Sequence, residues 1–106
     1  MEPQVLSVID LSFTREVLED ERPVLVYFWA DGPSKKLLSS LRKVAEERGG
    51  RLKVVEINTV FNSQMPHLSG IEEVPALALF KGGKVAATRT GELTAGALRA
   101  FVEAYL

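Results

Sequence analysis

Cysteine is absent from the 106 residues of this chain, and histidine occurs once, at His67. A chain without thiols cannot form a disulfide or supply a thiolate nucleophile. No cysteine stands near His67, so the sequence predicts no metal site. It also gives no sign of a cofactor. The lack of cysteine excludes thiol chemistry carried out by the chain alone.

Long apolar runs and blocks of like charge are also absent. No stretch approaches the roughly 20 apolar residues of a membrane span. The first residues, Met1-Glu2-Pro3-Gln4, have neither the basic nor the apolar region of an export signal. The net charge of -1 gives no footprint for nucleic acid or for an anionic membrane. We therefore expect a soluble, cytoplasmic protein that binds neither nucleic acid nor membrane.

The composition is that of one ordinary globular domain. Hydrophobic residues make up 46% of the chain and charged residues 25%, both usual for a soluble protein. A chain of this length can bury a single core. It contains no linker, repeat or low-complexity stretch, so we expect one domain over residues 1–106.

The hydrophobic pattern predicts strands and helices in alternation. Strands are expected over residues 4–9, 24–29, 52–57, 76–80 and 84–90. Helices are expected from Asp10 or Ser12 to about Glu19, from Gly32-Pro33 to Gly49-Gly50, within 58–69, and after Thr94. The run 24–29 is apolar on both faces, which is typical of a buried parallel strand. Gly82-Gly83 indicates a hairpin. The order βαβαβαββα predicts an α/β domain whose mixed sheet has helices on both faces.

Helical spacing also predicts which side chains face the core. The expected inner faces are Phe13, Val17 and Leu18 in the first helix, Leu37, Leu38, Leu41, Val44 and Ala45 in the second, and Leu98, Phe101, Val102 and Tyr105 in the last.

The turn Trp29-Ala30-Asp31-Gly32-Pro33-Ser34-Lys35 resembles the active-site turn of thioredoxins, Trp-Ala-x-Trp-Cys-Gly-Pro-Cys-Lys. Ser34 stands at the second cysteine, and the chain is two residues short where the first would lie. Four further stretches match the family in register: residues 23–30, the segment 58–75 through Gly70-Ile71 and Val74-Pro75, residues 79–83, and Gly91. The chain is therefore similar to the thioredoxin family over nearly its whole length, which implies a thioredoxin-like fold.

The resemblance implies a dithiol-disulfide exchange that this chain cannot perform, because a serine hydroxyl cannot form a disulfide. Family members also place a buried carboxylate at the position of Tyr27 and commonly a lysine at that of Glu56. A phenol with a reference pKa near 10 is a poor base at neutral pH. We interpret Tyr27 as a core aromatic residue whose hydroxyl finds one partner. The chain is then a redox-inactive variant with no catalytic residue.

The resemblance implies a cis peptide bond before Pro75, although the sequence does not fix the isomer. Such a turn would leave the backbone of Val74 open to pair with an extended peptide, or Pro75 could simply shape the fold. Val60 and Phe61 are apolar where thioredoxins usually carry acidic and polar residues, in a loop that borders the partner groove. We favour a contact patch that joins them to Pro75, with Met65 one helical turn beyond. The alternative is that they turn inward and fill space left by the short turn.

These residues support functions of different classes. We favour a redox-inactive module that binds a protein, an extended peptide segment or a second copy of itself. The expected groove consists of Trp29, Val60, Phe61, Val74, Pro75 and Gly91. The alternative is a superfamily enzyme that uses Ser34 at a helix start on a glutathione-like thiol, although such a serine more often caps the helix. A third hypothesis is an accessory role in thiol-disulfide chemistry through a partner's cysteines.

Overall fold

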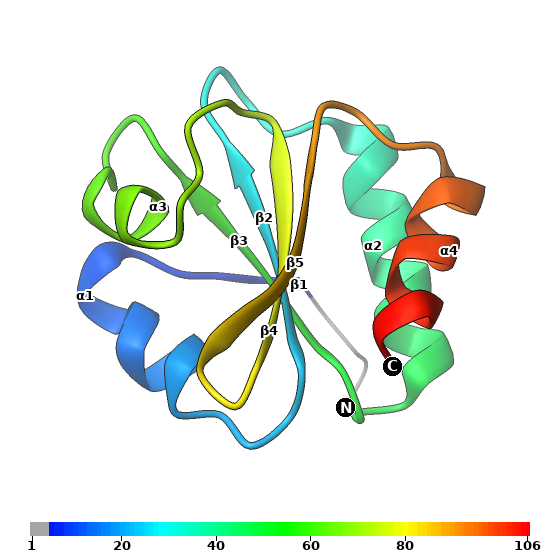
Figure 1. The fold of residues 1–106 in the computed structure, drawn as a ribbon. Coiled ribbons are helices and arrows are strands. Elements are labelled where there is room, and N and C mark those ends of the chain that lie inside the picture. The colour runs from blue at the N-terminus through cyan, green and yellow to red at the C-terminus, as the bar shows by residue number, and fades with distance from the viewer. Residues whose placement is uncertain (1–4) are drawn as a thin grey trace.

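Strands and helices alternate along the chain in the predicted order (Figure 1). The computed structural model describes residues 5–106, so the predicted strand start at Gln4 lies outside the described residues. The elements are β1 (Val5–Ser7), α1 (Asp10–Phe13), the π-helical segment η1 (Thr14–Leu18), β2 (Val24–Trp29), α2 (Lys35–Arg48), β3 (Lys53–Asn58), α3 (Gln64–Leu68), β4 (Ala76–Lys81), β5 (Lys84–Thr90) and α4 (Ala95–Tyr105). Within residues 5–106, no helix has the length and apolar character needed to cross a bilayer.

The five strands form one mixed sheet in the order β1-β3-β2-β4-β5. β1, β3 and β2 run parallel, β4 is antiparallel to β2, and β5 pairs with β4 as the predicted hairpin. The central strand β2 is buried from Val24 to Phe28. It is parallel to only one of its two neighbours. Helices α2 and α4 cover one face of the sheet, and α1 and α3 cover the other (Figure 1).

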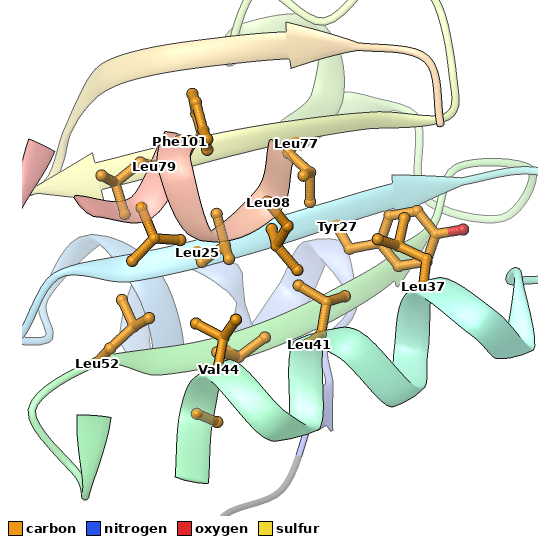
Figure 2. Packing of buried hydrophobic residues seen from close by; sticks show 13 residues of the cluster. Leu25, Tyr27, Leu37, Leu41, Val44, Leu52, Leu77, Leu79, Leu98 and Phe101 are labelled. Carbon is orange, nitrogen blue, oxygen red and sulfur yellow. The ribbon is translucent and has the colours of Figure 1, made fainter. Parts of the chain in front are cut away.

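The larger core lies between the sheet and helices α2 and α4 (Figure 2). The sheet contributes Leu25, Tyr27, Leu77 and Leu79, α2 contributes Leu37, Leu41 and Val44, and α4 contributes Leu98, Phe101 and Val102. The prediction for Tyr105 is wrong, because its side chain is 43% exposed. It is the last residue of α4 and packs its ring edge-on against Phe101, with 5.7 Å between ring centroids.

The opposite face of the sheet has its own core. It contains Phe13, Val17, Val26, Phe28, Ile57, Ala78 and Phe80 among others. The rings of Phe13 and Phe80 meet edge to face at 5.6 Å between centroids. Leu18 and Met65 are partly buried against this core, so Met65 belongs to the interior side of its segment.

The start of the first helix differs from the prediction. Its N-cap residue is Ile9, and Ser12 lies three residues further on, where its hydroxyl oxygen accepts a hydrogen bond from the Ile9 N–H at 3.1 Å. The Asp10 carboxylate instead accepts hydrogen bonds from the backbone N–H groups of Gln64 (3.2 Å) and Met65 (3.0 Å). Asp10 therefore satisfies donors at the start of α3, which would otherwise have no partner inside that helix. The local sequence pattern assigns Asp10 as the cap of its own helix, whereas in the structure its side chain contacts a different helix, α3.

Charged groups hold η1 and the following loop against β3. The Lys53 ammonium donates to the carbonyl oxygen and to Oε1 of Glu16, both at 2.8 Å, and lies 3.4 Å from Asp20. Arg22 donates to Asp20 from its backbone and from two guanidinium nitrogens. The hydrogen bonds from Arg22 hold the pKa of Asp20 well below its ordinary value. Those from Lys53 lower the pKa of Glu16.

The lowered pKa values of Asp20 and Glu16 predict that the protein loses stability at acidic pH, and we call this part of the stability curve its acid limb. A carboxyl group with a depressed folded-state pKa stabilises the fold above its unfolded pKa, about 4 for these residues, and loses that contribution as pH falls through the folded value. We therefore expect the melting temperature to hold near neutral pH and to fall below about pH 4. Asp20→Asn should lower stability at pH 7 and flatten the acid limb.

Thermal unfolding followed by circular dichroism between neutral and strongly acidic pH measures this effect. Glu21→Gln is the matched control, because Glu21 is an exposed neighbour that forms no ion pair within residues 5–106. An unchanged acid limb in Asp20→Asn would show that other groups govern acid unfolding.

Candidate binding site at the end of the central strands

Four segments far apart in the sequence meet at one end of the sheet (Figure 1). They are the turn after β2, the loop after β3, the segment before β4 and the segment after β5. The Thr59 backbone N–H donates to the carbonyl oxygen of Trp29 at 2.8 Å. The Gly91 N–H donates to the carbonyl oxygen of Pro75 at 2.7 Å. Backbone hydrogen bonds therefore fix these segments in two pairs.

The turn after β2 leads into α2 through Ser34. The helix begins at Lys35 and not at Gly32-Pro33, because Ser34 keeps an extended backbone and acts as its N-cap. The Ser34 hydroxyl oxygen accepts a hydrogen bond from the Leu37 N–H at 3.2 Å. This is the local capping role, and it occupies an oxygen lone pair with a structural contact. Gly32 turns the chain with φ of 102°, a backbone conformation that favours glycine.

Glu56 fixes the ring of Trp29. The indole Nε1–H donates to Glu56 Oε1 at 2.7 Å, and the Ser7 hydroxyl donates to Oε2 at 2.6 Å. Both carboxylate oxygens are thus engaged, and hydrogen bonds to an ionised group are stronger than those between neutral groups. The indole is held in one orientation at the end of β2.

A hollow of about 170 Å³ opens between the turn and the segment before β4. It is lined by Tyr27, Trp29, Ala30, Asp31, Gly32, Val74, Pro75 and Glu92. The Val74–Pro75 peptide bond is cis. The hollow therefore brings together six residues that were predicted for the degenerate turn and the groove. Pro33, Ser34 and Gly91 lie next to it and do not line it.

The Thioredoxin family model matches residues 4–104 of this chain. The chain belongs to the thioredoxin family. Proteins named thioredoxin in Pseudomonas aeruginosa and Acidithiobacillus ferridurans are 40% identical to it over 106 and 108 residues, which cover 98% and 100% of each chain. The thioredoxin of Allochromatium vinosum is 38% identical over 101 residues, or 93% of this chain and 94% of its own. Among the 106 residues of this family member there is no cysteine.

Tyr27 occupies the position where the family resemblance implies a buried carboxylate. Its side chain is 1% exposed, and its hydroxyl oxygen accepts one hydrogen bond, from the Ser34 N–H at 3.1 Å. Burial raises the pKa of Tyr27, because the phenolate would lose its hydration, and the nearby charges of Glu92 and Glu56 raise it further. The phenol is therefore neutral at pH 7 and cannot serve as a proton acceptor there. This confirms its interpretation as a core aromatic residue.

Val60 and Phe61 point away from the core of this thioredoxin-family domain. Their side chains are 59% and 82% exposed, so the alternative that they fill interior space is wrong. Asn62 takes the inner position. Its side chain accepts from the Asp10 N–H at 2.9 Å and donates to the Asn58 carbonyl at 3.0 Å. The exposed pair stands on the loop that Thr59 ties to Trp29, and it does not line the hollow.

Glu92 is the lining residue that was not singled out from the sequence. It is exposed, and it directly follows Gly91, which was assigned to the groove from the resemblance alone. The available signal was its adjacency to that glycine. A single exposed glutamate belongs to no sequence motif or periodicity, so the sequence does not distinguish it from an ordinary solvated surface residue.

Proposed function

We propose that this member of the thioredoxin family is redox-inactive and binds an extended peptide segment at the hollow beside Pro75. The observation that carries the proposal is the backbone of Val74. Within residues 5–106 its N–H and C=O have no hydrogen-bond partner, although β4 begins two residues later. An extended peptide can pair with free backbone groups of this kind through main-chain hydrogen bonds, as it does when it adds a strand to a sheet.

The loss of redox activity rests on the composition. Thiol-disulfide exchange requires an attacking thiolate and a second thiol that resolves the mixed disulfide. The chain offers neither, and the buried group at Tyr27 is a neutral phenol. The fold that positions these groups in relatives is retained, which leaves binding without exchange as the activity that the site supports.

The protein would recognise a bound peptide through both the backbone and the side chains of that peptide. A peptide strand beside Val74 can exchange main-chain hydrogen bonds with it, and alternate peptide side chains then point toward the protein. One of them can enter the hollow against Trp29 and Pro75. Main-chain bonds supply affinity and the hollow supplies selectivity.

A selection experiment tests this function. Random nine-residue peptides displayed on phage are selected on the purified protein, and the recovered peptides are added to isotope-labelled protein for NMR. We expect shifts at the Val74 amide and at the Trp29 indole N–H. Failure to recover any peptide that binds, or shifts confined to the opposite end of the sheet near Glu21, would contradict the proposed function.

The exposed Val60-Phe61 pair gives a further prediction. If it extends the contact surface, Phe61→Asp should weaken the binding of selected peptides, because the change removes apolar contact and adds a charge that binding must desolvate. Since Phe61 is largely exposed, the substitution should change the free energy of unfolding of the protein by no more than about 0.5 kcal/mol.

Calorimetric titration and thermal unfolding of the same variant separate these effects. Val85→Asp is a matched control, because Val85 is an exposed apolar residue at the hairpin end of β5, far along the strand from Gly91. Sedimentation at several concentrations shows whether the same pair also supports self-association. Unchanged peptide affinity and unchanged sedimentation in Phe61→Asp would remove this pair from the contact surface.

A further inference from the structure

The hollow is acidic. Asp31 and Glu92 are two of its eight lining residues, and none of the eight is basic. Glu72 and Glu73, both exposed, directly precede Val74. None of these four carboxylates forms an ion pair within the described part of the chain. The charges of Asp31 and Glu92, which line the hollow, are therefore available to whatever enters it.

The basic residues that lie nearest to this cluster in the sequence are Lys35, Lys36 and Arg89, and none of them lines the hollow. Lys36, in the first turn of α2, lines a neighbouring hollow together with Glu92. It does not line the hollow beside Pro75, and it is not within ion-pair distance of Glu92. The lining of the hollow thus carries two carboxylates and no basic group.

Aromatic groups form the floor of the same hollow. Trp29 and Tyr27 both line it, and the Glu56 carboxylate fixes the orientation of the indole through Nε1. The face of a tryptophan ring attracts a cation within about 6 Å of its centre. Aromatic rings and carboxylates around one small hollow favour the same kind of ligand, a positively charged side chain.

We propose that the hollow takes the side chain of a lysine or arginine carried by the bound peptide. This inference rests on the proposed function and specifies its partner, an extended segment with a basic residue at the position opposite the hollow. Asp31 and Glu92 attract the charge, the ring of Trp29 contacts it, and Val74 pairs with the peptide backbone. The attraction depends on salt, because exposed charges are screened over about 10 Å at 0.1 M.

The peptide selection provides the first test. Peptides recovered on the unmodified protein should be enriched in lysine and arginine at one position relative to the starting library. Representative peptides are then synthesised with that residue and with norleucine, which keeps the apolar stem and removes the charge. We expect the charged form to bind on the order of tenfold more tightly at about 0.01 M salt, with the difference nearly lost at about 1 M.

Protein variants test whether the named carboxylates are responsible. In the double variant Asp31→Asn and Glu92→Gln, the preference for the charged peptide over its norleucine form should disappear, because the charged peptide loses the carboxylates that attract it. Glu21→Gln, which changes charge at the opposite end of β2, should keep the full preference.

The outcomes separate the two proposals. Recovery of peptides without enrichment of basic residues, or equal binding of the charged and norleucine forms, overturns the basic-residue inference and leaves the binding function standing. Equal loss of preference in Glu21→Gln also overturns it, because the effect would then come from net charge alone. Recovery of no peptide at all overturns both.

Discussion

Restoration of two cysteines is expected to turn this chain from one with no catalytic effect on insulin disulfide reduction into a measurable catalyst. The change consists of inserting Trp-Cys between Asp31 and Gly32 and replacing Ser34→Cys. The unmodified protein should reduce insulin with dithiothreitol only at the uncatalysed rate, since it has no thiol. The restored cysteines would lie at the start of α2, where the helix N-terminus lowers a thiol pKa and favours the thiolate.

The restored reaction has a defined course. One thiolate attacks an insulin disulfide, forms a mixed disulfide and releases one insulin thiolate. The second thiol then attacks the mixed disulfide, which frees the other insulin sulfur and leaves a disulfide in the protein. Dithiothreitol reduces that disulfide and is itself oxidised. Ser34→Cys alone is the matched control, because a single thiol cannot complete this cycle.

Turbidity of precipitating insulin chains measures the rate. Clear turnover by the unmodified protein, in a preparation free of contaminating thioredoxin, would contradict the redox-inactive reading. If the rebuilt turn forms its disulfide and still gives no turnover, the absence of cysteines is not the main reason why the chain lacks redox activity.

The fold was predictable because independent signals agree along the sequence. The run 24–29, the helical spacing from Leu37 to Ala45 and the turn at Gly82-Gly83 each describe local structure, and the matched stretches fix their order in space. Asp10 shows where such reasoning ends. Local pattern offers it as a cap for its own helix, whereas the structure uses it for α3, more than fifty residues away. A long-range contact leaves no local periodicity.

The site was predictable only in part for the same reason. Trp29 and Pro75 were assigned from the resemblance, and the structure brings both to one hollow. Two orientations of Phe61 were open, because an isolated apolar residue in a loop carries no period that selects a face. In the structure the Asn62 side chain takes the inward position and forms hydrogen bonds with Asp10 and Asn58, and Phe61 beside it is exposed. Glu92 acquires its significance only when the segment after β5 is placed beside the turn.

Tyr27→Asp is expected to cause the largest loss of stability of any change considered for this chain. Tyr27 is among the largest fully buried side chains and packs in the core beneath α2 (Figure 2). Replacement leaves a cavity, which costs about 3–5 kcal/mol for large aromatic truncations. It also buries a carboxyl group and removes the acceptor for the Ser34 N–H. Tyr27→Phe is the matched control, because it keeps the ring and should cost only about 1 kcal/mol.

The pH dependence of Tyr27→Asp distinguishes a buried carboxyl from a cavity alone. Burial is expected to raise the pKa of the introduced carboxyl above its unfolded value. The charged form is then disfavoured in the folded protein, so the stability loss should grow as pH rises above about 4 and level off once pH exceeds the folded pKa. Tyr27→Ala should show the cavity cost without this pH dependence. Equal pH profiles for the two variants would show that the carboxyl reaches solvent.

In the protein with the rebuilt turn, the same substitution should act in the opposite direction on rate. A carboxylate at residue 27 would lie at the N-terminus of α2, where the Ser34 N–H now meets the phenol, and could take the proton that a cysteine must lose. Turnover should therefore rise above that of the rebuilt turn with Tyr27 retained, at lower stability. If the rebuilt turn with Tyr27 already matches the thioredoxin of Pseudomonas aeruginosa measured beside it, the phenol is no obstacle, and the missing thiols alone account for the lost reaction.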